Sequence, residues 1–471
     1  QALAIREKVL DPEHPSVAES LNNLGEFYRF QGRYAEAEPL LGRSLAIWEE
    51  ALGPEHPYVA TNINNLALLY VGEGRYAEAE PLYRRALAIR QTALGPNHPE
   101  VAQSLNNLAA VHEKQDRFVE ALSLRRQATN IYRARASRAT GRRSAGALSE
   151  QQLARSIFIG HVWLAQISAE REPERWMPLT AEAFEVAQLA RATSVAAAVA
   201  RMAARFAAGD DDLARLVRAR QDAIDAWQRL DQALVKAVSQ PPDKRDVQAE
   251  ARLRTDLAAL DRRLTGLDAE LAQAFPDYAE LATPQPVALA GIQELLGPDE
   301  ALMVYLVWDE STFLWVVRPD WAELHRIAVG ADDLADAVAD LRAGLDPTAI
   351  NRLGEIPPFD TTKAYELYSQ IFAPIESLLE DVRHLMVVPD GALQSLPVGV
   401  LVTEEPRQPV TDFADYRQVP WLARQYAVTV LPAVSSLEAL RYFAETTRAT
   451  QPFIGFGDPL LEGRPGSGRG I

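Results

Sequence analysis

One nine-residue segment occurs twice in this chain, and its two copies lie 42 residues apart. Residues 32–40 and 74–82 both read GRYAEAEPL, and a weaker copy covers 116–122. Two shorter motifs keep the same spacing, namely Asn-Asn-Leu at 22–24, 64–66 and 106–108, and His-Pro at 14–15, 56–57 and 98–99. A period of this length predicts stacked units of supersecondary structure, because each unit buries its apolar face against its neighbours.

Each unit is predicted to contain two helices. Small residues recur where neighbouring helices must approach closely, at Gly25, Ala67 and Ala109 in the first helix and at Ala37, Ala79 and Ala121 in the second. We expect Tyr34, Tyr76 and Phe118 to fill the space between helices. Gly53-Pro54 and Gly95-Pro96 should end the second helices, since glycine stops a helix and proline cannot continue it. Residues 2–10 match the second helix of a preceding unit.

The period, the Asn-Asn-Leu motif and the Gly-Arg-Tyr-x-Glu-Ala turn resemble the tetratricopeptide repeats of kinesin light chain over residues 1–135. This resemblance implies a right-handed superhelix with a concave groove that binds a protein or peptide ligand. It maps inner groove positions onto Asn22, Asn23, Asn64, Asn65, Asn106 and Asn107. An asparagine amide both donates and accepts hydrogen bonds, which suits an extended peptide backbone. Alternatively, these residues are solvated or pair between repeats.

Four histidines belong to the repeats. His14, His56 and His98 are expected to form hydrogen bonds within their loops, since each lies one repeat away from the next and they cannot share a metal. His112 stands where Tyr28 and Tyr70 stand in the earlier units, and it is therefore expected to pack against its neighbours.

Residues 136–147, rich in Gly, Ser and Arg, are predicted to be a linker, and residues 148–280 a helical, coiled-coil connector. Leucines from Leu253 to Leu271 alternate spacings of four and three, as in a heptad seam. Pro241-Pro242 separates them from an earlier apolar helix, which predicts an antiparallel hairpin within the chain. The seam could instead join two copies, so the sequence leaves the oligomeric state open.

Residues 281–471 change in pattern. Strands are predicted at 301–308, 312–318, 323–329, 384–388, 426–430 and 453–456, and helices at 331–343 and 361–380. Asp309-Glu310-Ser311 suggests a hairpin between the first two strands. Short strands that alternate with helices predict an α/β region with a mainly parallel sheet covered by helices. The fold class is therefore multidomain, with an all-α superhelix and helical hairpin before an incomplete α/β domain.

Several phrases of this region resemble the CHAT domain, a caspase-like module found after tetratricopeptide arrays. They are FPDYA at 275–279, GPDEAL at 297–302, VPDGAL at 388–393, Leu396-Pro397 and FGDP at 456–459. The resemblance implies a cysteine peptidase whose histidine activates a thiolate. In that family both residues lie beyond the FGDP phrase, where this chain ends. We therefore carry over no catalytic residue, although Asp390-Gly391 should form a tight turn near the cleft.

Composition excludes several function classes. The sequence has no cysteine, so disulfides, thiolate catalysis and Cys-based zinc sites are impossible within it, and its seven histidines lack metal-binding spacing. No cofactor or metal site is predicted. A net charge of −17 argues against nucleic-acid binding, and no apolar run is long enough to span a membrane.

The chain begins at Gln1 within a repeat and ends in a loop-like tail, so we expect the natural protein to extend beyond both ends. Two hypotheses follow. In the first, the repeats recruit a partner or substrate to a caspase-like cysteine peptidase domain. The catalytic part of that domain is missing from this chain, which alone is expected to be inactive. In the second, the protein is a non-enzymatic adaptor with a degenerate CHAT module. The combination of repeats and CHAT implies a bacterial, cytoplasmic protein.

Overall fold

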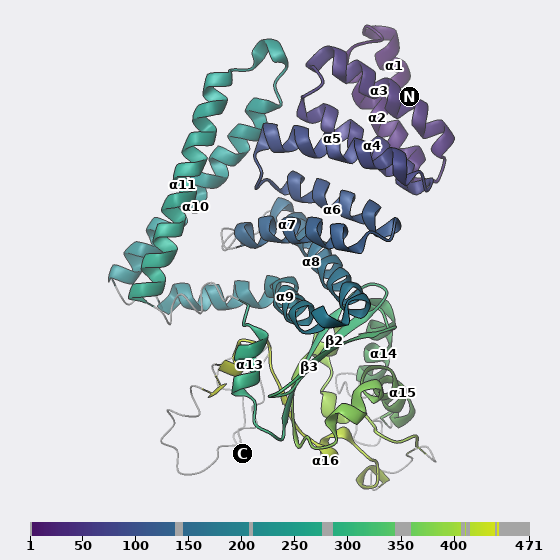
Figure 1. Cartoon of the computed structure of the whole chain (residues 1–471), viewed down its shortest axis with the longest axis vertical. Helices are drawn as coiled ribbons and strands as arrows, with labels where there is room; N and C mark the ends of the chain where they lie inside the picture. The colour runs from purple at the N-terminus through teal and green to yellow at the C-terminus, as the bar shows by residue number, and fades with distance from the viewer. Residues whose placement is uncertain are drawn as a thin grey trace, which may run out of the picture.

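The computed structural model describes residues 2–136, 145–206, 211–275, 286–343, 359–406, 410, 415–438 and 440–441. The predicted strand at 453–456, the FGDP phrase and most of the FPDYA phrase lie outside these residues. Figure 1 shows a stack of helices, a long helical hairpin beside it, and a sheet region at the other end. No helix in the described ranges is both long and apolar enough to cross a membrane.

The repeat units are pairs of helices with the predicted boundaries. The amino-terminal helices are α1 (Ala2–Val9), α2 (Pro15–Phe30), α3 (Tyr34–Leu52), α4 (Pro57–Gly72), α5 (Tyr76–Leu94), α6 (Pro99–Lys114) and α7 (Phe118–Ala136). α3 and α5 end directly before Gly53 and Gly95, whose φ angles are 81° and 90°. Only glycine adopts this left-handed region without steric strain, which explains why a glycine follows each of these two helices.

The recurring histidines cap the first helix of each unit. The Nδ1 atoms of His14, His56 and His98 accept hydrogen bonds from the amides two residues ahead, at 3.1, 3.2 and 3.2 Å. A proline follows each histidine at the first helical position, where its missing N–H and fixed φ suit a helix start. The predicted role in loop hydrogen bonding is confirmed. An Nδ1 that accepts must be unprotonated, so these caps require neutral imidazoles.

Small residues lie where helices cross, as predicted. Ala67 and Ala109 have no exposed surface. A Cβ added at Gly25 would lie 2.7 Å from Cγ of Leu41, and one added at Gly72 would lie 2.8 Å from the hydroxyl of Tyr34. Tyr34 therefore packs against the first helix of the next unit, in the space that the sequence assigned to it.

Helix stacking continues beyond the recognised repeats. α8 (Ala145–Arg171) and α9 (Trp176–Phe206) pack against each other, and α8 also packs against α7. Residues 145–147 of the predicted linker belong to α8, while 137–144 lie outside the described residues. Leu122 stands where the earlier units have Glu38 and Glu80, and it is 1% exposed in a core shared with α8 and α9. The polar junction between units is thus replaced by an apolar one.

The next two helices form the predicted hairpin. α10 (Asp211–Val238) and α11 (Val247–Ala274) bury Ile224 and Trp227 against Leu264, and a short 3-10 turn, Pro242–Lys244, follows Pro241. The tip of the hairpin packs on the carboxyl end of α5, through Leu234 and Val238. Figure 1 shows the pair standing beside the repeat stack. The leucine seam therefore faces a helix of its own chain.

The sheet region combines antiparallel and parallel strands. Its strands are β1 (Glu300–Val307), β2 (Thr312–Val317), β3 (Ala322–Ile327), β4 (His384–Val388) and β5 (Ala427–Val430), in the order β3-β2-β1-β4-β5. β1 pairs antiparallel with β2, and β2 with β3, whereas β1–β4 and β4–β5 are parallel. The prediction of a mainly parallel sheet was wrong, because short connections can join only antiparallel strands.

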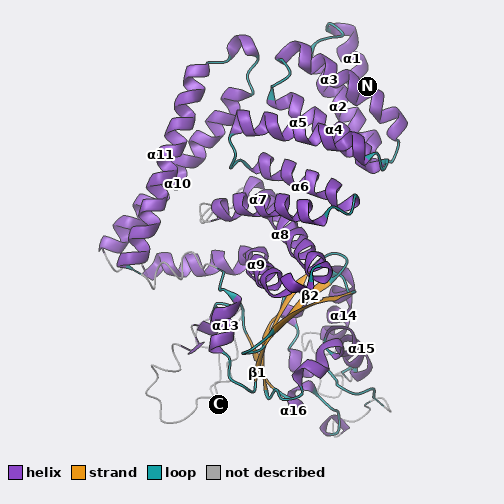
Figure 2. Cartoon of the chain, in the orientation of Figure 1, coloured by secondary structure: helices purple, strands orange, loops and turns teal. Residues whose placement is uncertain are grey.

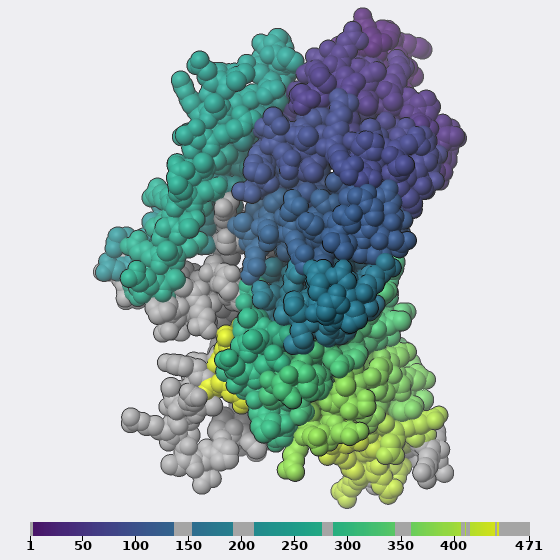
Figure 3. Space-filling model, in the orientation of Figure 1, coloured from purple at the N-terminus to yellow at the C-terminus, as the bar shows by residue number. Residues whose placement is uncertain are grey.

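Helices cover both faces of the sheet, which Figure 2 shows in orange. One face packs on α14 (Ala331–Ala343) and α15 (Thr361–Ile371), and the 3-10 turn Ala373–Leu379 completes the second predicted helical stretch. The other face packs on α13 (Leu289–Leu295) and on α9. The rings of Phe184 on α9 and Trp315 on β2 meet edge to face at 6.3 Å. Figure 3 shows the repeat stack and the sheet region as one continuous column. The expected domain boundary at 280/281 stays a prediction, and α9, on its amino-terminal side, is part of the sheet's core.

Candidate peptide-binding surface

The predicted groove asparagines lie along the first helices of three consecutive units. Asn65 Nδ2 donates to Asn22 Oδ1 at 3.0 Å, and Asn107 Nδ2 donates to Asn64 Oδ1 at 2.8 Å. The second asparagine of each unit thus bonds to the first asparagine of the unit before it. We call the six predicted residues the asparagine ladder, namely Asn22, Asn23, Asn64, Asn65, Asn106 and Asn107. Its pairing between repeats is one of the alternatives that the sequence left open.

The ladder keeps unused hydrogen-bonding capacity. Asn65 and Asn107 are half-buried, and Asn23, at the equivalent place in the first unit, is exposed. Asn22 Oδ1 also accepts from Asn62 Nδ2 at 3.2 Å, which uses both of its lone pairs, and Asn64 is buried. An asparagine side chain has two N–H donors and two acceptor lone pairs, so the capacity for a ligand lies mainly in Asn23, Asn65 and Asn107. A line of amides at fixed spacing can accordingly pair with the backbone of an extended peptide.

Arg125 closes the ladder at its carboxyl-terminal end. Its guanidinium donates to Oδ1 of Asn106 and, at 2.9 Å, to Oε1 of Glu113. A Cβ added at Gly160 of α8 would lie 2.6 Å from Nη1 of Arg125, so the guanidinium fits only beneath a glycine. Sequence reasoning missed this residue, because Leu41 and Tyr83 occupy its place in the earlier units and the position carries no recurring polar signal.

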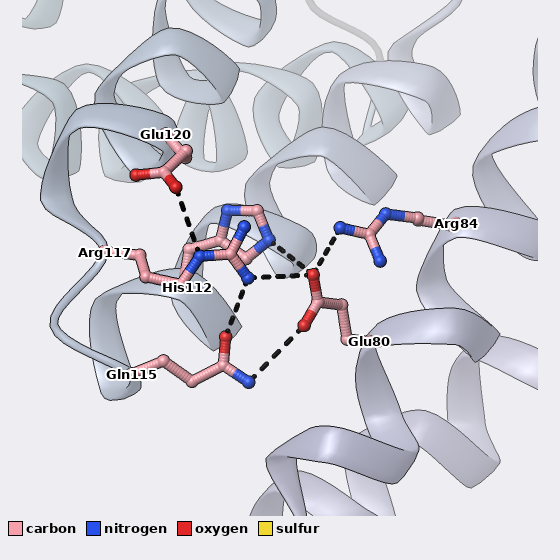
Figure 4. A network of polar contacts seen from close by, with 6 residues as sticks. All are labelled: Glu80, Arg84, His112, Gln115, Arg117 and Glu120. Carbon is pink, nitrogen blue, oxygen red and sulfur yellow. Dashed lines mark hydrogen bonds and ion pairs between the residues drawn. The ribbon is translucent and has the colours of Figure 1, made fainter.

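A second polar network joins successive units through the last Glu of the GRYAEAE motif. Glu38 accepts from the hydroxyl of Tyr70 at 2.9 Å and from Arg75 at 3.2 Å. One unit later, Glu80 accepts at 3.0 Å from both His112 and Arg117, as Figure 4 shows. The arginine of each turn therefore pairs with the glutamate of the unit before it. His112 is buried and packs as predicted, and it also holds this glutamate.

The charge of Glu80 is held in place by its donors. Burial acts to raise the pKa of Glu80, but hydrogen bonds from Arg117 and His112 outweigh it and lower the pKa to about 2. The carboxylate therefore stays ionised throughout the physiological range. The sequence signal for this network was present, since the glutamate and the arginine recur with the repeat.

Replacing Glu80 with alanine is expected to lower the free energy of unfolding by about 1–3 kcal/mol, because it removes a charged acceptor from the buried imidazole of His112. Urea denaturation followed by the helical circular dichroism signal measures the change. The matched control is Glu78→Ala, two residues before Glu80. It removes an exposed ion-pair partner of Arg75 and should leave the midpoint nearly unchanged. Equal midpoints for the two variants would contradict the structural role of Glu80.

At the sheet, the chain turns at Asp390-Gly391 as predicted, and the amide of Leu393 donates to the carbonyl of Asp390 at 3.2 Å. Asp390 has a further role through its side chain. It is 5% exposed, and its Oδ2 accepts from the amide of Val307 at 2.9 Å. Gly391 follows with φ 56° and begins the 3-10 turn Gly391–Ser395. Asp390 thus connects the carboxyl ends of β1 and β4, a position that spacing along the chain did not predict.

Comparison with known protein families divides the chain into matched parts. Residues 1–41, 16–92 and 62–134 match the tetratricopeptide repeat family, and residues 361–465 match the CHAT domain. The chain contains tetratricopeptide repeats and a CHAT domain. This confirms both resemblances and the predicted fold class. The CHAT match begins at the start of α15 and includes β4 and β5, so that β1, β2 and β3 precede it.

Two solved structures illustrate the similarity of this chain to known structures. One is a Podosopora anserina structure described as kinesin light chain nearly identical TPR-like repeats, with 28% identity, a TM-score of 0.28, and coverage of 38% of this chain and 82% of that one. Another is BtubC (BKLC) from P. vanneervenii, with 21% identity, a TM-score of 0.32, and coverage of 39% and 68%. No curated protein matches the chain significantly.

Proposed function

We propose that the tetratricopeptide array binds an extended segment of a partner protein and recruits that partner to the CHAT domain. The asparagine ladder carries the proposal. It places amide groups at one-repeat intervals along neighbouring helices, and three of them, Asn23, Asn65 and Asn107, keep part of their surface exposed. Tetratricopeptide repeats generally act through protein partners, and a main-chain ligand needs such alternating donors and acceptors.

The recruited partner would be a substrate or activator of a caspase-like peptidase. Such a peptidase needs a thiolate nucleophile and a histidine that activates it. The 471 residues include no cysteine, so this chain by itself is expected to have no cysteine-peptidase activity. The catalytic pair would have to be supplied by other residues of a longer protein.

A second candidate is a non-enzymatic adaptor whose CHAT domain only binds. The two candidates differ in one observation. If the gene encodes a His-Gly phrase and a cysteine, each after an apolar strand, downstream of the codon for Ile471, the peptidase candidate is supported. If it encodes neither, the adaptor is the better proposal.

Replacing Asn23, Asn65 and Asn107 together with alanine is expected to weaken peptide binding at least about tenfold, since each lost hydrogen bond contributes about 0.5–1.5 kcal/mol. The probes are peptides selected on the unmodified chain from a random 12-residue phage library, and their affinities are measured by calorimetry. Asn97→Ala, which changes an exposed loop residue, is the control.

Folding of the triple variant must be measured separately, because Asn65 and Asn107 also bond between repeats. An unchanged circular dichroism spectrum and a small shift of the unfolding midpoint would show that the array is intact. If the folded variant binds the selected peptides as tightly as the unmodified chain and the Asn97→Ala control, the ladder is not the binding surface.

A further inference from the structure

The carboxyl ends of β1 and β4 lie side by side at the centre of the sheet. β1 and β4 are parallel, and from β1 the chain proceeds outward to β3 before it returns to β4 on the other side. In open α/β sheets such a reversal of strand order leaves a crevice, where ligands usually bind. Here that position holds the Asp390 loop, defined as residues 389–396, and two arginines from the helical part of the chain.

Both arginines bond to groups at this edge of the sheet. Arg155 of α8 donates to the carbonyl of Val307 at 2.9 Å and to Oδ2 of Asp390 at 3.0 Å. Arg191 of α9 donates to the carbonyl of Val388 at 3.1 Å and to that of Pro389. Its Nε lies 3.9 Å from Oδ1 of Asp390. The two guanidinium groups therefore satisfy the last carbonyls of β1 and β4 and the carboxylate that joins these strands.

This joint is buried and charged. The side chains of Arg191 and Asp390 are 10% and 7% exposed. Burial lowers the pKa of Arg191 to about 10, against the opposing effect of Asp390, so the guanidinium stays charged at neutral pH. A buried ion that loses its partner is strongly destabilised, and the loop should consequently follow the arginines when they move.

α9, which carries Arg191, is also bonded to the repeats nearer its amino-terminal end. Glu182 of α9 accepts two hydrogen bonds from Arg126 of α7, each 2.6 Å long, and a third contact of 2.8 Å joins it to Nε2 of His161 on α8. Glu182 and Arg191 are nine residues apart, or roughly 13 Å along a continuous helix. Figure 1 shows α9 between the repeat stack and the sheet.

We propose that α9 is a coupling helix, which transmits movement of the last repeat helix, α7, to the Asp390 loop at the carboxyl edge of the sheet. Glu182 receives the movement, and Arg191, together with Arg155, passes it to the loop. The coupling is a property of the chain itself and does not depend on whether the asparagine ladder binds a peptide. A bound partner that shifts α7 would be one way to use it.

A double-mutant cycle on the full chain, read by hydrogen exchange, tests the coupling. The reporters are the amide of Val307, which Asp390 holds, and the amide of Leu393, which bonds to the Asp390 carbonyl. In Arg155→Ala/Arg191→Ala, both amides should exchange at least about tenfold faster, because the buried carboxylate is left unpaired. Glu182→Gln should speed their exchange several-fold in the unmodified chain and have no effect in the double variant.

Two further variants make the result decisive. Arg220→Ala breaks an arginine–aspartate pair of similar length in the hairpin, and it should change neither reporter. If the double variant does not fold, Arg191→Lys replaces it, since lysine keeps the charge but cannot bond to two carbonyls and a carboxylate as guanidinium does. The proposal is overturned if Glu182→Gln leaves both amides unchanged, or if it speeds exchange equally with and without the arginines.

Discussion

Replacing Phe184 with alanine is expected to lower the free energy of unfolding by about 3–5 kcal/mol, the usual cost of removing a fully buried aromatic side chain. Phe184 lies on a helix that the sequence assigned to a connector, but its side chain has no exposed surface and packs against Trp315 in the sheet. The alanine would leave a cavity between α9 and β2. This loss should appear in the sheet as well as in the helices.

Urea denaturation measures the effect, with hydrogen exchange of the β2 amides reporting on the sheet and circular dichroism on the helices. Phe27→Ala is the matched control, since Phe27 is 55% exposed and its removal should change stability by no more than about 0.5 kcal/mol. If Phe184→Ala behaves like the control, α9 does not contribute to the core of the sheet region. If only the β2 amides respond, the two parts unfold independently.

The repeats could be predicted from the sequence because their determinants are local and recur. Each helix end is marked by its own residues, as at Gly53 and His56, and each close crossing by a small residue such as Ala67. A 42-residue period shows all of these together. The prediction that the hairpin pairs within the chain also held, because Pro241-Pro242 allows only a short connection between two apolar helices.

The joint between helices and sheet could not be predicted in this way. Arg155 and Asp390 are 235 residues apart, and neither stands in a pattern that marks a partner at such a distance. An apolar stripe shows that a helix such as α9 is buried, but not whether a helix or a sheet covers it. The hairpin of β1 and β2 was predicted from its short connection, but the antiparallel pairing of β3 was not, and the sheet as a whole was therefore expected to be mainly parallel.

The asparagines show how far a repeated motif can be interpreted. Recurrence indicates that Asn22 and Asn64 are needed at the same place in each unit, yet it does not distinguish a ligand contact from a contact between units. The structure shows that these asparagines do bond to asparagines of the next unit. Binding of a partner stays a proposal, which depends on the donors and acceptors that this contact leaves free.

Acidification is expected to destabilise the array through the cap at His98. Burial, assisted by Arg135 and Arg90, lowers the pKa of His98 from 6.5 to about 4, and its Nδ1 must stay unprotonated to accept from the amide of Glu100. Above pH 6.5 the imidazole is neutral in both states and the full stability is present. Between pH 6.5 and 4 only the unfolded chain takes up the proton, so the free energy of unfolding falls by up to about 3 kcal/mol.

His98→Asn separates this effect from the titration of carboxylates. Asparagine is a favoured residue at this helix position and does not titrate, so the variant should match the unmodified chain at pH 8. Carboxylates act equally in both proteins, with Glu80 and Glu182 ionised down to a pKa of about 2. In urea denaturation series from pH 8 to pH 4, the variant should therefore become progressively more stable than the unmodified chain, by up to about 3 kcal/mol at pH 4. Parallel curves would mean that His98 takes up its proton as readily in the folded as in the unfolded state, and that the cap does not depend on a neutral imidazole.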